Sequence, residues 1–156
     1  IKWSTNMNSQ SNETMVRAFM ERAFHQGELS AVDAFNAPDG VDHQEPPGTD
    51  LIAHLKQVVV ALRTAFPDLH FEIHELLADG DIVAFRSTMT GTHTGTLSIL
   101  PGQSLPPTGR RVAVPHMYFL RVVDGKTTDL WHLWNIPMMM QQLGITAAPQ
   151  AAQRQP

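Results

Sequence analysis

The chain contains no cysteine among its 156 residues. Disulfide bonds, thiolate nucleophiles and cysteine-based zinc sites are therefore excluded. Basic side chains are also few: Lys and Arg total 11 against 15 Asp and Glu, and their scatter along the chain argues against a nucleic-acid-binding surface. No apolar run approaches the ~20 residues that span a bilayer, and residues 1–6 lack the basic flank and apolar centre of a signal peptide. We therefore expect a cytoplasmic protein that binds neither nucleic acid nor membrane.

The residues that are present fit one folded domain. At 42% hydrophobic residues, a chain of this length can bury a core. Because Met7 looks like a natural start, we expect residues 1–10 to be disordered or extraneous to the fold. We expect residues 11–145 to form the single domain. Residues 146–156 are rich in Ala, Pro and Gln without an apolar pattern, which predicts a disordered tail.

The periodicity of apolar residues changes once along the chain, from helical spacing to alternation. Helical spacing predicts helices over residues 12–27, 29–35 and 49–66. Alternation predicts strands over residues 69–78, 82–92, 111–123 and 127–135. Residues 97–108 contain three prolines and are expected to form a loop or lid, and Pro137 is expected in the first turn of a last short helix. Helices followed by an antiparallel meander predict an α+β fold.

Several short segments resemble one known family. They are Phe66-Pro67-Asp68-Leu69, Gly91-Thr92-His93-Thr94-Gly95, Pro107-Thr108-Gly109-Arg110, Asp124-Gly125-Lys126 and Gln141-Gln142-Leu143-Gly144. With the order of elements over residues 13–144, they are similar to the SnoaL-like polyketide cyclases, a branch of the NTF2-like superfamily. The resemblance implies a cone in which three N-terminal helices wrap a strongly curved antiparallel sheet, with a short C-terminal helix. It also implies a pocket that works without a cofactor.

His132 marks a departure from that family. The family's strand after Asp-Gly-Lys usually reads His-Trp-Asp, and its Asp is the general acid/base; aligned without gaps, that Asp falls on His132. A cyclase of this type removes a proton from a carbon between carbonyl groups and returns one to a carbonyl oxygen. One side chain can do both if its pKa lies near the working pH, and histidine begins at ~6.5. We therefore predict that His132 is catalytic. The alternative is a hydrogen-bonded pocket residue in a protein that only binds its ligand.

Two registers are open for the hairpin at Asp124-Gly125. A two-residue type I′ turn, which Asp-Gly favours, would place His132 opposite Met117. A three-residue turn would place His132 opposite His116. We choose the second register because it gathers on one face the positions that line the pocket in the family resembled, and a slip of one residue would turn them all outward. These positions are His116, Tyr118, Leu130, His132 and Trp134.

The remaining candidates are assigned on the same resemblance. His116 and Tyr118 are expected to orient the substrate or protonate its oxygen; the equal alternative is a hydrogen-bonded polar pair inside a partly wet cone. Leu130 and Trp134 are expected to bind the substrate. His43 is expected at the pocket rim. Arg86 is expected to reach inward toward an anionic oxygen, although a partly exposed strand arginine is an equal alternative. Met138 is expected to supply adaptable packing at the pocket mouth.

Metal binding is not expected. Three imidazoles, those of His43, His116 and His132, have the chemistry of a catalytic zinc site, but no local ligand spacing supports one.

The sequence predicts a cofactor-free enzyme that carries out an aldol-type cyclisation or a related isomerisation on a hydrophobic polyketide-like or polyaromatic small molecule. The alternatives are a hydrolase or hydroxylation partner that uses a histidine-activated water, and a small-molecule binding protein without turnover.

A homodimer is expected from the opposite face of the same hairpin. In the chosen register four large apolar side chains point away from the pocket: Met117, Phe119, Trp131 and Leu133. Together they would expose a larger apolar patch than monomers usually tolerate.

Overall fold

The computed structural model describes residues 7–100 and 102–145. The helical elements are α1 (Met7–Phe19), η1 (Met20–His25), α2 (Leu29–Phe35), α3 (Leu51–Ala65) and α4 (Ile136–Gln142). The predicted helices are present, although α1 already begins at Met7. The expected tail at residues 146–156, and residues 1–6 of the expected N-terminal extension, lie outside the described residues.

Five strands form the main sheet in the order β1-β7-β6-β3-β2. They are β1 (Asn36–Asp42), β2 (His70–Asp79), β3 (Ile82–Thr92), β6 (Arg111–Val123) and β7 (Lys126–Trp134). Four of them form the predicted meander, but β1 pairs with β7 in parallel, so the sheet is mixed rather than wholly antiparallel. The expected loop at residues 97–108 instead contains a small hairpin of β4 (Leu97–Leu100) and β5 (Gln103–Leu105).

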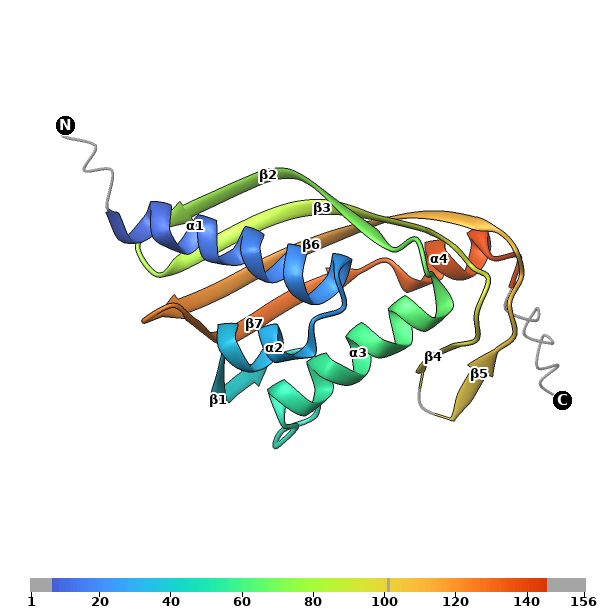
Figure 1. Ribbon diagram of the computed structural model, residues 1–156, viewed down its shortest axis with the longest axis horizontal. Helices are drawn as coiled ribbons and strands as arrows, with labels where there is room; N and C mark the ends of the chain where they lie inside the picture. Colours follow the sequence, from blue (N-terminus) through green and yellow to red (C-terminus); the bar gives the residue numbers. More distant parts are fainter. Residues whose placement is uncertain (1–6, 101, 146–156) are drawn as a thin grey trace, which may run out of the picture.

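The helices α1, α2 and α3 all cover one face of the curved sheet (Figure 1). Helix α3 begins at the N-cap Asp50, whose side chain accepts a hydrogen bond from the Ala53 N–H. Its buried residues recur at helical spacing and enter the core: Leu51, Leu55, Val59, Leu62 and Ala65. No helix of the described residues is both long and apolar enough to cross a membrane.

The segment Gly91-Thr92-His93-Thr94-Gly95 fixes the end of α3 against the sheet. The backbone N–H groups of Thr94 and Gly95 both donate to the carbonyl oxygen of Ala65, each at 3.1 Å. A Cβ on Gly95 would lie 1.9 Å from the backbone oxygen of Thr64, so only glycine permits this approach. The motif therefore sets the position of α3, and with it the helical wall of the cavity described below.

The hairpin between β6 and β7 has the two-residue turn that Asp-Gly favours. Asp124 and Gly125 have φ values of 51° and 73°, as a type I′ turn requires, and Val123 pairs with Lys126. The expected three-residue turn was therefore wrong. A bulge then shifts the register: Val122 pairs with Thr127, but Arg121 pairs with Asp129.

The bulge places His116 opposite Trp134 and Tyr118 opposite His132. The predicted pairing of His116 with His132 was wrong by two residues. Because side chains alternate with a period of two, a shift of two leaves the same side chains on the same face. The predicted face is thus correct, for a reason that the turn alone does not supply.

Candidate active site

A cavity of about 340 Å³ lies between α3, the residues after β1, and the inner face of β6 and β7. Its polar wall consists of Asp42, Gln44, Glu45, His54, His116, Tyr118 and His132. Its apolar wall includes Leu55, Val58, Leu62, Phe71, Leu130 and Trp134. A mostly apolar cavity with a few converging polar groups is the usual form of a small-molecule site.

The central contact joins two strands. His132 Nε2 on β7 lies 3.1 Å from Asp42 Oδ2 at the end of β1. The Asp42 side chain is 1% exposed, whereas that of His132 is 23% exposed, so the imidazole remains open to the cavity. Burial disfavours the Asp42 carboxylate, but hydrogen bonds from His132 and from the Gln44 backbone N–H outweigh it and lower the pKa of Asp42. Asp42 is therefore a carboxylate at neutral pH.

Gln44 completes the support of His132. The strand β1 ends at Asp42, so the His132 backbone N–H has no strand partner on that side. The Gln44 side-chain oxygen accepts from it at 2.8 Å instead. The Gln44 backbone N–H in turn donates to Asp42 Oδ1 at 2.9 Å. Gln44 therefore holds both Asp42 and His132 in place.

His116 and Tyr118 form an aromatic wall beside this pair. The His116 ring lies 5.7 Å from the Tyr118 ring and 4.9 Å from the Trp134 ring. Burial lowers the pKa of His116 to about 3, so its imidazole is neutral. Burial, reinforced by Asp42, raises the pKa of Tyr118. Neither ring exchanges a proton readily near neutral pH, which fits orientation of a substrate better than protonation of it.

Three of the expected site residues lie elsewhere. His43 pairs with Asp129 at 2.9 Å and stacks on Trp131 at 4.4 Å, on the outer face of the sheet. Strand alternation explains this, since neighbours on a strand point to opposite faces and Asp42 points inward.

Arg86 and Met138 are also outside the cavity wall. Arg86 lies on the outer face because the inward positions of β3 are taken by its neighbours Phe85 and Ser87. Its side chain is 49% exposed and forms a bidentate ion pair with Glu75. Met138 does not line the cavity among the described residues; Ile136 of α4 does so instead.

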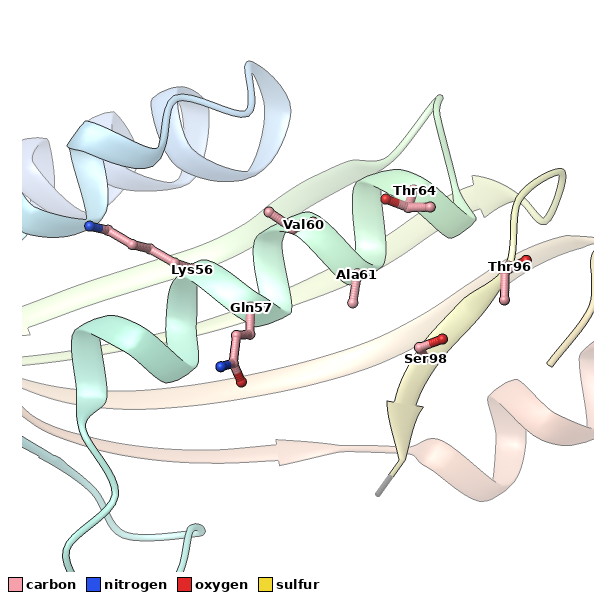
Figure 2. A pocket seen from close by; sticks show the side chains of 7 residues that line it. All are labelled: Lys56, Gln57, Val60, Ala61, Thr64, Thr96 and Ser98. Carbon is pink, nitrogen blue, oxygen red and sulfur yellow. The ribbon is translucent and has the colours of Figure 1, made fainter. Parts of the chain in front are cut away.

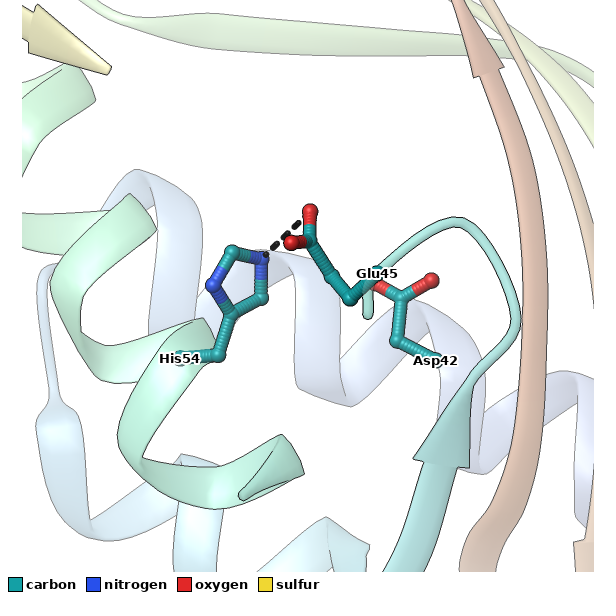
Figure 3. Close-up of side chains that lie close together, drawn as sticks. All are labelled: Asp42, Glu45 and His54. Carbon is teal, nitrogen blue, oxygen red and sulfur yellow. Dashed lines mark ion pairs between the residues drawn. The ribbon is translucent and has the colours of Figure 1, made fainter. Parts of the chain in front are cut away.

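The three imidazoles considered for a metal site, and not expected to form one, do not come together, because His43 lies on the outer face while His116 and His132 face the cavity. The structure instead brings together Asp42, Glu45 and His54, which offer ligand atoms within 4.8 Å of one another (Figure 3). The His54 Nε2 lies 3.4 Å from Glu45 Oε1.

Four site residues were not anticipated from the sequence: Asp42, Gln44, Glu45 and His54. His54 carried a usable signal, since it lies beside Leu51, Leu55 and Val58 on the inner side of α3, and a polar residue within an apolar helical face is unusual. The sequence signal for Asp42 was weaker, because inward and outward positions on a short strand cannot be told apart until the neighbouring strand is known.

A second hollow lies on the outside of the molecule (Figure 2). It separates α3 from β4, and is lined by Lys56, Gln57, Val60, Ala61, Thr64, Thr96 and Ser98. Its one ionisable group, Lys56, is already paired with Asp33 at 2.7 Å. This groove therefore lacks the converging acid and base groups of the first cavity.

The comparisons with known proteins agree with the resemblance seen in the sequence. The family model described as SnoaL-like polyketide cyclase matches residues 14–143. A search of curated proteins finds no significant match.

Solved structures are also similar. A putative SnoaL-like polyketide cyclase from Jannaschia sp. CCS1 has a TM-score of 0.76 and 19% identity, over 94% of this chain and 100% of that chain. AclR, a putative hydroxylase from Streptomyces galilaeus, has a TM-score of 0.71 and 26% identity, over 90% and 89%. IdmH, a putative polyketide cyclase from Streptomyces antibioticus, has a TM-score of 0.67 and 30% identity, over 85% and 98%. The chain belongs to the SnoaL-like polyketide cyclase family.

Proposed function

We propose that the protein is an enzyme that carries out an aldol-type cyclisation, or a related isomerisation, by general acid/base catalysis without a cofactor. The observation that carries this proposal is the Asp42–His132 pair, because it sets a carboxylate-supported imidazole into the wall of an apolar cavity. Carboxylate-oriented imidazoles are efficient proton acceptors near neutral pH.

His132 is the base in this proposal. With Nε2–H donating to Asp42, the lone pair of Nδ1 is left for the substrate. Nδ1 takes a proton from a carbon flanked by carbonyl groups, and the resulting enolate carbon attacks a second carbonyl within the same molecule. Asp42 stabilises the imidazolium that forms and fixes the ring orientation. In the family resembled, the general acid/base is an Asp at this position. Here the reacting group is the His132 imidazole, and the carboxylate, that of Asp42, supports it.

The cavity wall favours a hydrophobic polyketide-like or polyaromatic substrate. Tyr118 and Trp134 offer aromatic surfaces, and the volume of about 340 Å³ lies within the usual range for small-molecule sites. The buried nitrogens His116 Nδ1 and Trp134 Nε1 have no hydrogen-bond partner among the described residues. Both atoms are closed off from solvent, so the wall offers a substrate the faces of these rings rather than their nitrogens. The neighbours described as putative polyketide cyclases support the same substrate class.

A second candidate uses the same pair differently. An imidazole backed by a carboxylate can also activate water, which would give a hydrolase or a partner in a hydroxylation. The likeness to AclR, described as a putative hydroxylase, favours keeping this candidate. The third alternative, a protein that only binds its ligand, would catalyse neither the cyclisation nor the reaction with water.

A triketone that can close a six-membered ring distinguishes these functions. Its carbon between two carbonyl groups attacks the third carbonyl. The proposal predicts that the wild-type protein accelerates closure and that His132→Ala lowers kcat by ~10²–10⁴-fold with a smaller change in KM. A protein that binds the triketone without accelerating closure contradicts the proposal and supports the binding function.

A further inference from the structure

The cavity contains a second imidazole–carboxylate pair that the proposed function does not use. His54 projects from α3 and Glu45 from the segment after β1, with 3.4 Å between His54 Nε2 and Glu45 Oε1 (Figure 3). Both side chains line the cavity and are partly exposed, at 24% and 31%. The pair is therefore close enough to a bound substrate to contact it and open enough to exchange protons with water.

The two pairs are neighbours. Polar atoms of Asp42, Glu45 and His54 lie within 4.8 Å of one another, and the positive charge that His54 can carry helps to lower the pKa of Asp42. The His132 imidazole is hydrogen-bonded to the same Asp42. Two imidazoles thus approach one region of the cavity from opposite sides, one from the sheet and one from α3.

An aldol closure needs an acid as well as a base. When the enolate carbon attacks, the electron pair of the carbonyl π bond moves to oxygen, and that oxygen must gain a proton. Neither His116 nor Tyr118 fits this role. Burial holds the first as a neutral imidazole with a pKa of about 3, and raises the pKa of the second. The acid must therefore be either His132, after it has taken the first proton, or another group.

We propose that His54 is this acid, a second catalytic residue beside His132, and that Glu45 positions it and stabilises its protonated form. The inference rests on the proposed function and refines it. His132 begins neutral and gains the carbon-bound proton. The carbon–carbon bond forms, and the carbonyl oxygen takes the proton of the His54 imidazolium. His132 then releases a proton to water and His54 regains one, so the cycle balances.

Two probes separate the acid from the base. 5-Nitrobenzisoxazole opens when a base removes its carbon-bound proton, and it needs no acid because a nitrophenolate leaves. The triketone described above needs both. We expect His54→Gln to lower ring closure ~10–10²-fold while benzisoxazole opening stays within ~2-fold of wild type. Glu45→Gln should lower ring closure less, through kcat rather than KM. His132→Ala should lower both reactions.

His74→Gln is the matched control, since His74 is exposed on β2 and lies outside the cavity; it should change neither reaction. Ring closure that is unchanged in His54→Gln would overturn the inference and leave His132 to transfer both protons. Equal losses on both probes would also overturn it, because His54 would then act by holding the Asp42–His132 pair. If His132→Ala opens benzisoxazole at the wild-type rate, or if the wild-type protein accelerates neither reaction, the proposed function itself fails.

Discussion

His132 on β7 and Asp42 on β1 are 90 positions apart in the sequence, and their side chains meet at 3.1 Å between Nε2 and Oδ2. The parallel pairing of β1 with β7 creates this contact, since Asp42 and Leu130 are Cα partners and His132 is two residues further along the same face. A carboxylate that is 1% exposed thereby supports an imidazole that can reach a ligand.

Asp42→Asn tests that support. Asparagine keeps the shape of the side chain but cannot stabilise an imidazolium, so we expect kcat for ring closure to fall by ~10²-fold with little change in KM. Asp129→Asn is the control, because Asp129 on β7 pairs with the other neighbouring histidine, His43, on the outer face of the sheet. Equal kinetics for Asp42→Asn and the wild-type protein would mean that the pair is structural.

The buried His116 predicts how stability depends on pH. Burial lowers its pKa from 6.5 to about 3, so between these values the unfolded chain binds a proton that the folded chain does not. The free energy of unfolding therefore rises with pH across this window and falls again as the pH is lowered through it. One proton changes this free energy by at most ~1.4 kcal/mol per pH unit. Urea unfolding at pH 7 and pH 5 measures the difference.

His116→Phe isolates that contribution. Phenylalanine retains the packing among Phe71, Tyr118 and Trp134. It removes the Nδ1 atom, which has no hydrogen-bond partner within the described part of the chain. We expect the variant to lose less stability than the wild-type protein between pH 7 and pH 5. An unchanged difference between the two pH values would show that His116 is not the group responsible.

The outer face of the sheet predicts a homodimer. Met117, Phe119 and Leu133 are 54%, 48% and 70% exposed there, an apolar patch that a second copy of the chain would cover. We expect a dimer by light scattering at micromolar concentration and a monomer for Phe119→Glu. Val60→Glu serves as the control, because Val60 is 50% exposed on α3, away from this face. A monomeric wild-type protein would contradict the prediction.

Metal dependence is not expected, although Asp42, Glu45 and His54 offer ligand atoms within 4.8 Å of one another. Both carboxylates already face imidazoles, so a cation would have to displace these contacts. Ring closure should therefore be unaffected by chelators. A stoichiometric ion in the purified protein, lost together with activity in Glu45→Gln, would show that the cluster is a metal site.

The sequence predicted the family and the helices, because these depend on short motifs and local periodicity. It also predicted the cavity face of the last hairpin, but from the family resemblance and with the wrong turn, since a bulge supplies the shift in register. It did not predict the Asp42–His132 contact, which depends on a parallel pairing between distant strands. Nor did it predict the bulge at residues 127–129, which nothing in the turn residues indicates. The outward position of His43 was missed, and the inward and outward alternatives for Arg86 stayed open, for a related reason: a shift of one residue along a strand decides which face a side chain takes, and the neighbouring strands set that register.

The most direct measurement compares His132→Asp with His132→Ala in the ring-closure reaction across pH. If His132 is the proton-transferring group, aspartate restores the family's residue and should keep measurable turnover. Its pH–rate profile should be moved, because the ordinary pKa of Asp differs from that of His and the new carboxylate would stand beside that of Asp42. His132→Ala should be slower than wild type by ~10²-fold or more. An aspartate variant as inactive as the alanine variant, or an alanine variant as active as wild type, would contradict this account.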